Sequence, residues 1–110
     1  GHYKIDTIVA ILDANGLQGD GAVQEQMDHF PVLEKVRAFK WNAIEIDGHN
    51  IAQIRNALEN AKNIQAKPTF IFARTVKGKG VSFMENSVYW HGSVGITDEQ
   101  LAIALKDLGA

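Results

Sequence analysis

One asparagine near the start of the chain has the chemistry of a metal ligand. Asn15 closely follows the apolar residues 8–12 and precedes Gly16. Its amide oxygen is the hard donor that Mg²⁺ accepts, and Mg²⁺ usually takes only one or two protein side chains, with phosphates and water completing its shell. An Asn-Gly pair is also ordinary turn chemistry. The residue types alone leave both interpretations open.

A histidine far along the chain is the side chain best suited to proton transfer. His91 stands between Trp90 and Gly92, which could hold an imidazole at the wall of a cleft. Imidazole exchanges protons readily near neutral pH and is the commonest general acid or base. A lone histidine is also often a satisfied surface or core group, and the same two interpretations apply to His49.

A basic, glycine-containing loop offers positive charge for an anion. Lys77 and Lys79 alternate with glycines and could attract a diphosphate or a sugar phosphate, although a solvated loop is the simpler alternative. The triplet Gly19-Asp20-Gly21 is predicted to be a turn. The sequence has no specifically spaced serine triad, catalytic carboxylate pair or histidine metal cluster.

The elements that would position these residues alternate between strand and helix. Residues 8–12 form an unbroken apolar run, which predicts a strand buried on both faces of a parallel sheet. The glycines that follow let backbone approach a ligand closely. Ligands of open α/β sheets bind beyond the carboxyl ends of the strands, so we expect the site in the loop 15–21. Further along we expect helix 31–40, strand 41–47, helix 50–62, strand 69–76, an irregular stretch 77–95 and helix 97–108.

Capping residues fix the starts of two of these helices. Asn50 with Gln53 and Thr97 with Gln100 have capping-box spacing. The inward faces are predicted from helical spacing: Ile51, Ile54, Ala57, Leu58 and Ala61 in one helix, and Leu101, Ile103, Ala104 and Leu108 in the other. The alternation of strands and helices predicts α/β architecture with parallel βαβ units.

Composition excludes several classes of protein. The 110 residues carry a net charge of −2 without a basic stripe, which argues against nucleic-acid and membrane-surface binding. The absence of cysteine excludes disulfides and thiolate metal sites. We see no signal-peptide pattern and no membrane-length apolar run, so a cytoplasmic protein is expected.

The ordered motifs resemble transketolases, particularly those divided into two subunits. The resemblance spans essentially the whole chain and rests on residues 2–6, 9–21, 33–39 with Trp41, 45–49, 67–69, 75–86 and 90–92. Any one of these motifs is weak, whereas the ordered series is specific.

The resemblance implies a three-layer α/β/α fold that binds thiamine diphosphate and Mg²⁺. It implies an enzyme that moves a two-carbon ketol unit between sugar phosphates, with chemistry supplied by the cofactor. In the family, positions matched by the Asn15 side chain and the Leu17 backbone carbonyl bind the metal. The histidine matched by His91 faces the diphosphate and the substrate, which implies both a cofactor-binding and a catalytic role.

Departures from the family pattern predict an incomplete site. The family's metal-binding Gly-Asp-Gly lies well upstream of the asparagine, so Gly19-Asp20-Gly21 cannot replace it, and the glutamate that activates the cofactor belongs to a separate domain. Gly19 replaces a usual isoleucine, and Gly95 stands near a usual proline.

We therefore expect residues 1–110 to be a single partial domain, the carboxyl-terminal part of a diphosphate-binding domain that is inactive alone. Its expected partners are the rest of that domain, a pyrimidine-domain chain and a sugar phosphate, in a homo- or hetero-oligomer. The alternatives are a fragment of deoxyxylulose-phosphate synthase or another member of the superfamily, a non-catalytic α/β binding module and a structural remnant.

Overall fold

The chain forms two compact units. The computed structural model describes residues 1–19, 21–92 and 94–110. The first unit contains Gly1–Ala14 and His29–Thr75, and the second contains Asn15–Asp28 and Val76–Ala110. Asp20, the centre of the predicted Gly19-Asp20-Gly21 turn, lies outside the described residues.

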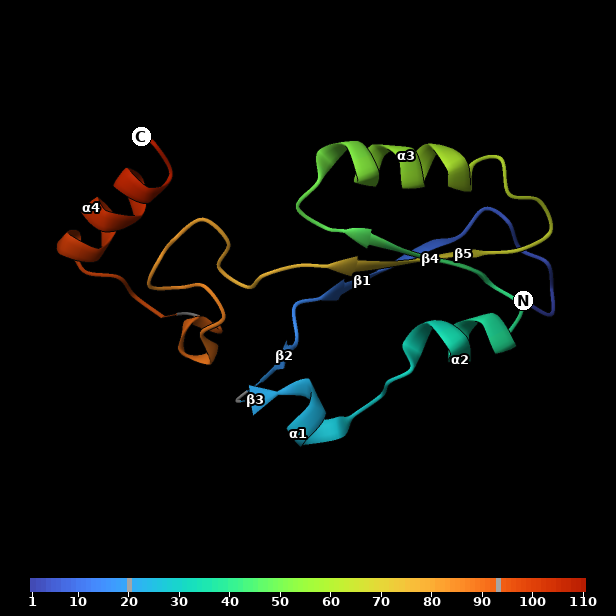
Figure 1. Ribbon diagram of the computed structural model, residues 1–110, viewed down its shortest axis with the longest axis horizontal. Helices are drawn as coiled ribbons and strands as arrows, with labels where there is room; N and C mark the ends of the chain where they lie inside the picture. The colour runs from blue at the N-terminus through green and yellow to red at the C-terminus, as the bar shows by residue number, and fades with distance from the viewer. Residues whose placement is uncertain (20, 93) are drawn as a thin grey trace. The chain divides into compact units, whose positions relative to one another are not determined.

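The first unit is a parallel sheet between two helices. Its strands are β1 (Val9–Ala14), β4 (Asn42–Asp47) and β5 (Thr69–Arg74), in the spatial order β1-β5-β4. Helices α2 (Val32–Ala38) and α3 (Ile51–Ala61) lie on opposite faces of this sheet (Figure 1). The layers confirm the α/β prediction and its parallel βαβ units.

The core of this unit is centred on β5. This strand pairs in parallel with β1 on one side and β4 on the other, so that Ile71 is opposite both Ile11 and Ile44. Ile71 and Phe72 point to opposite faces, and their exposed fractions are 1% and 2%. β5 is therefore the strand buried on both faces.

The prediction that residues 8–12 are buried on both faces is wrong for this structure. Val9 and Ile11 are 40% and 58% exposed. Within the described residues, β1 pairs with β5 alone and α3 packs against β4. The odd-numbered side chains of β1 therefore remain partly uncovered.

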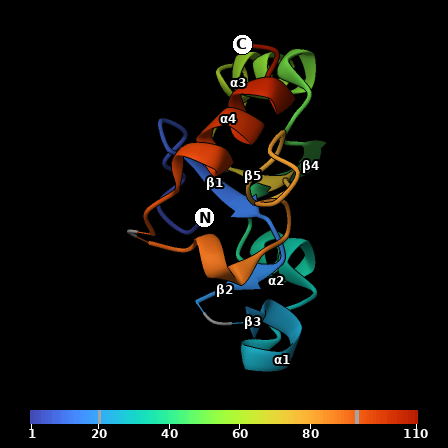
Figure 2. The same ribbon diagram turned by 90° about the vertical axis from the view of Figure 1, so that its left-hand side faces the viewer.

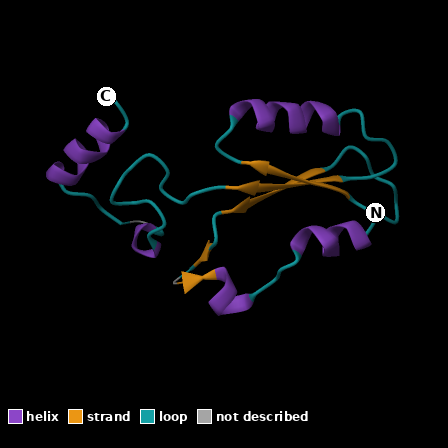
Figure 3. Cartoon of the chain, viewed as in Figure 1, coloured by secondary structure: helices purple, strands orange, loops and turns teal. Residues whose placement is uncertain are grey.

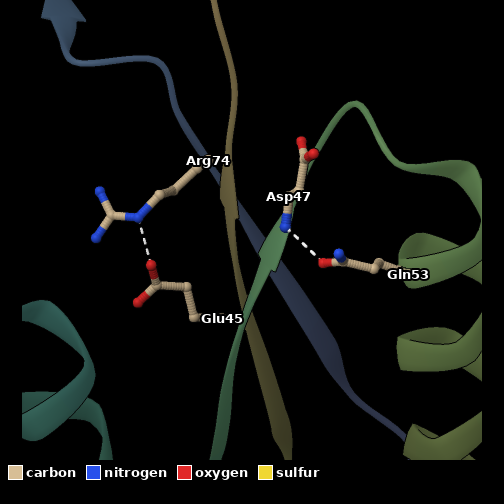
Figure 4. Close-up of polar contacts among 4 residues, drawn as sticks. All are labelled: Glu45, Asp47, Gln53 and Arg74. Atoms are coloured by element: carbon tan, nitrogen blue, oxygen red, sulfur yellow. Dashed lines mark hydrogen bonds and ion pairs between the residues drawn. The ribbon is translucent and has the colours of Figure 1, made fainter.

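Only one of the two predicted capping contacts forms at the start of α3. The Asn50 side chain accepts a hydrogen bond from the Gln53 backbone N–H at 3.1 Å. The Gln53 side chain, however, accepts from the Asp47 N–H at 2.8 Å instead of returning to Asn50 (Figure 4). It thereby ties α3 to the last residue of β4.

The predicted inward face of α3 is only partly correct. Ala57 and Ala61 are buried, whereas Ile51 is 76% exposed. Ile51 lies more than one helical turn before the first of these alanines. The fully buried positions of this helix are thus two small side chains in its later turns.

The second unit contains short elements and one longer helix. A ribbon that the sequence did not predict pairs β2 (Leu17–Gln18) with β3 (Gly21–Ala22) in antiparallel fashion. Figures 2 and 3 show helix α1 (Val23–Met27) beside this ribbon. The 3-10 turn η1 (Val88–Trp90) falls within the stretch predicted to be irregular.

Helix α4 (Asp98–Asp107) begins with the predicted capping box of Thr97 and Gln100. Its predicted inward face is wrong at three positions, because Leu101, Ile103 and Leu108 are 43%, 46% and 61% exposed. Only the small side chain of the fourth position, Ala104, is buried. In the described part of the chain, no helix has the length and apolar character needed to cross a membrane.

Candidate functional site

Asn15 closes a turn directly after β1. Its Oδ1 atom accepts a hydrogen bond from the Leu17 backbone N–H at 2.9 Å, and both residues are half-buried. Gly16 between them has a φ of +77°, a conformation that glycine adopts without steric cost. The turn therefore holds the amide oxygen of Asn15 over the backbone of Leu17, the two residues predicted to bind a metal.

The donor chemistry of this turn fits a divalent cation such as Mg²⁺. An amide oxygen has two lone pairs, so Asn15 Oδ1 retains one beyond its bond to Leu17. The described residues contain no group of three or more His, Cys, Asp or Glu side chains that could hold a metal. Two neutral oxygens, Asn15 Oδ1 and the Leu17 backbone carbonyl oxygen, would suit a Mg²⁺ ion that takes its other ligands from phosphates and water.

His91 lies at the end of η1, beside one of the loop lysines. Its Nδ1 atom is 3.5 Å from Lys77 Nζ, and the imidazole is exposed. The direction of this contact depends on the tautomer of the imidazole. Two residues predicted separately, the histidine and a lysine of the basic loop, are thus neighbours.

Aromatic packing supports the backbone just before this histidine. The indole N–H of Trp90 donates to the Phe83 carbonyl at 3.0 Å, and the two rings meet edge to face with centroids 5.3 Å apart. The His91 N–H donates to the Val88 carbonyl at 3.1 Å. These contacts fix the peptide from which the imidazole projects.

The second loop lysine has a different partner. Lys79 Nζ lies 3.4 Å from Glu85 Oε1, which also accepts a hydrogen bond from the Gly80 N–H at 3.0 Å. The two lysines therefore differ, since Lys77 reaches His91 and Lys79 reaches a carboxylate. Asn15, Leu17, His91 and both lysines belong to the second unit.

Sequence reasoning missed a group of polar contacts at the carboxyl ends of the strands. Arg74 pairs with Glu45, and the Thr75 hydroxyl donates to the Asp13 carboxylate (Figure 4 shows the first pair). The guanidinium also lies 5.3 Å from the Phe72 ring centroid. These contacts cross between strands, so sequence spacing gave no signal for them.

The turn after β4 is the one part of this region that the sequence signals. Asp47 Oδ1 accepts the His49 N–H at 2.9 Å, as the Asp-Gly pair predicts. The bond holds His49 within the turn by its backbone.

The chain is similar to proteins of one family. Residues 1–110 match the family described as transketolase, thiamine diphosphate binding domain. A 6-deoxy-6-sulfo-D-fructose transketolase subunit from Clostridium sp. is 40% identical over 98% of this chain and 39% of its own length. An apulose-4-phosphate transketolase subunit from Phocaeicola vulgatus is 35% identical over 96% of this chain and 37% of its own length. Human transketolase is 44% identical over 82% of this chain and 14% of its own length.

A solved structure extends the match to three dimensions. The crystal structure of transketolase from Campylobacter jejuni superposes with a TM-score of 0.89 at 30% identity, covering 99% of this chain and 17% of that one. The chain thus spans well under half the length of these relatives. It belongs to the family of transketolase thiamine diphosphate binding domains.

Proposed function

We propose that this chain is part of a thiamine-diphosphate-dependent transketolase that transfers a two-carbon ketol unit between sugar phosphates. The observation that carries the proposal is the Asn15–Leu17 turn, which directly follows a parallel strand of a family-matched fold. Anionic cofactors of α/β proteins bind beyond the carboxyl ends of such strands. The chain contributes part of the site for Mg²⁺ and the diphosphate.

Three residues have distinct roles in this proposal. The Asn15 amide oxygen and the Leu17 backbone carbonyl would hold Mg²⁺, and the metal would offset the negative charge of the diphosphate. His91 donates a hydrogen bond to the diphosphate or substrate and moves a proton during transfer. The cofactor itself supplies the carbon centre that carries the two-carbon unit.

The active protein requires further polypeptide. We take residues 1–110 to be the carboxyl-terminal part of one diphosphate-binding domain, because the chain spans 39% of a subunit-type relative and leaves Val9 and Ile11 of β1 exposed. The remainder of that domain covers this surface and completes the metal site. A pyrimidine-domain chain joins it in an oligomer, and the 110 residues alone are inactive.

The test compares this chain with the complete protein assembled with its partner. We expect the assembly to transfer ketol units only with Mg²⁺ and thiamine diphosphate, and calorimetry to detect no tight cofactor binding by the chain alone. Asn15→Ala in the assembly should weaken binding of cofactor and metal. Asn63→Ala is the matched control. Asn63 belongs to the first unit, where its exposed amide donates to the Glu59 carbonyl. An Asn15→Ala assembly with wild-type affinity would refute the assigned site, and tight binding by the isolated chain would refute its incompleteness.

A further inference from the structure

The basic loop is folded back on itself. The Asn86 N–H donates to the Lys77 carbonyl at 2.9 Å, which closes residues 77–86 into a ring that we call the closed loop. Gly78 has a φ of +72°, and a Cβ atom there would lie 2.5 Å from the Met84 carbonyl oxygen. The two arms of the closed loop are therefore in direct contact.

One carboxylate links the arms. Glu85 Oε1, on the returning arm, accepts the Gly80 N–H at 3.0 Å and lies 3.4 Å from Lys79 Nζ on the outgoing arm. Gly80 also has a positive φ of +96°, which only glycine adopts readily. A charged acceptor makes the stronger class of hydrogen bond, so Glu85 fixes the point at which the chain turns.

The outer side of the closed loop is attached to α4. The Ser82 N–H donates to Asp107 Oδ2 at 2.8 Å. The hydrogen bonds from Ser82 also hold the pKa of the Asp107 carboxyl below its usual value. With Glu85 inside and Asp107 outside, the backbone between Lys79 and Ser82 is held from two directions.

The two lysines of the closed loop make different contacts. Lys79 is paired within the closed loop, whereas Lys77, at the point of closure, lies 3.5 Å from His91 Nδ1. Of the two lysines, Lys77 is therefore the one whose position bears on the imidazole. That position depends on the closure from Asn86 to Lys77, next to which Glu85 joins the two arms.

We propose that Glu85 is a positioning residue, which holds the closed loop in the shape that sets Lys77 against His91 and so orients the imidazole. The catalytic part of this inference rests on the proposed function. The structural part, from Glu85 to the His91 ring, stands independently of it. Lys79 assists through its charge, and the bond from the Gly80 N–H to Glu85 supplements the backbone bond from the Asn86 N–H to the Lys77 carbonyl.

Three variants of the assembled protein separate these contacts. Glu85→Ala removes both the hydrogen bond from the Gly80 N–H and the ion pair with Lys79. Lys79→Met removes only the ion pair, and Glu85→Gln keeps an oxygen acceptor for the Gly80 N–H. We expect Glu85→Ala to speed amide exchange at Gly80 about tenfold or more, as local opening becomes easier. It should also shift the His91 ring resonances. Lys79→Met and Glu85→Gln should stay near wild type, and exchange at Ile71 in the other unit should not change.

Kinetics add a measurement that a merely structural role would not alter. If His91 is misplaced, Glu85→Ala should lower kcat by about tenfold to a hundredfold with little change in KM, because small displacements of reacting groups cost rate. Glu85→Gln should retain most of the wild-type kcat. Unchanged Gly80 exchange or an unmoved His91 ring in Glu85→Ala would overturn the proposal, and so would wild-type kcat despite both changes. An inactive wild-type assembly would refute the proposed function, while exchange and ring resonances would still decide the structural role of Glu85.

Discussion

Two glycines in left-handed conformations should respond very differently to alanine. Gly78 and Gly16 have φ values of +72° and +77°, so each alanine variant pays a backbone cost of about 1 kcal/mol. A Cβ at Gly16 meets no described heavy atom within 4 Å, whereas one at Gly78 would lie 2.5, 2.6 and 2.7 Å from the O, C and Cβ atoms of Met84. Two of these are backbone atoms that cannot rotate away. Overpacking of this kind adds about 1–3 kcal/mol, so Gly78→Ala should cost about 2–4 kcal/mol in total.

Urea unfolding followed by tryptophan fluorescence measures this difference in the second unit. The chain has two tryptophans, and Trp90 packs on Phe83 within the same unit as the closed loop. A Trp41→Phe background therefore leaves Trp90 as the only reporter. We expect Gly78→Ala to lower the free energy of unfolding by at least about 1 kcal/mol more than Gly16→Ala. Equal losses would show that the arms of the closed loop are not in contact and would refute the reasoning from the Gly78 geometry.

Four further substitutions test other parts of the structure. Asn50→Ala removes the α3 cap and should cost about 1 kcal/mol in urea unfolding; no loss would contradict the cap. A lowered pKa means that the Asp107 contact with Ser82 stabilises above the ordinary carboxyl pKa and is lost as pH falls through the lowered value. Amide exchange of α4 should therefore speed up as the pH falls through this range in the wild type and not in Asp107→Asn. The same pH dependence in Asp107→Asn would show that another group causes it. Ile11→Lys, at a 58% exposed site, should change unfolding by less than about 0.5 kcal/mol and reduce self-association of the isolated chain in light scattering. Ile71→Ala, at a 1% exposed site, should cost about 2–5 kcal/mol, and equal costs for these two would contradict the assigned core.

The local sequence predicts helices and strands well and burial poorly. Asn50 and Thr97 mark helix starts because a cap depends on residues only three positions apart. Residues 8–12 and the strand β5 look equally apolar, yet β5 is central and β1 lies at the edge of the sheet. Burial depends on which strands and helices lie alongside, and a local pattern does not specify those neighbours.

The candidate site shows the same division between local and tertiary information. Asn15 and His91 are recognisable from residue type and position, and the Asn15 turn is closed by a contact only two residues long. The different contacts of Lys77 and Lys79 could not be predicted, because both residues adjoin Gly78 in one loop. They differ only because folding places a carboxylate against one and an imidazole against the other.

A crystal structure of the complete protein with Mg²⁺ and thiamine diphosphate would test the central claim most directly. We predict the Asn15 amide oxygen and the Leu17 carbonyl oxygen at about 2.1 Å from the metal, with the His91 imidazole hydrogen-bonded to the same diphosphate or to the bound sugar. A metal and diphosphate bound elsewhere, or an Asn15 side chain directed away from them, would contradict the account.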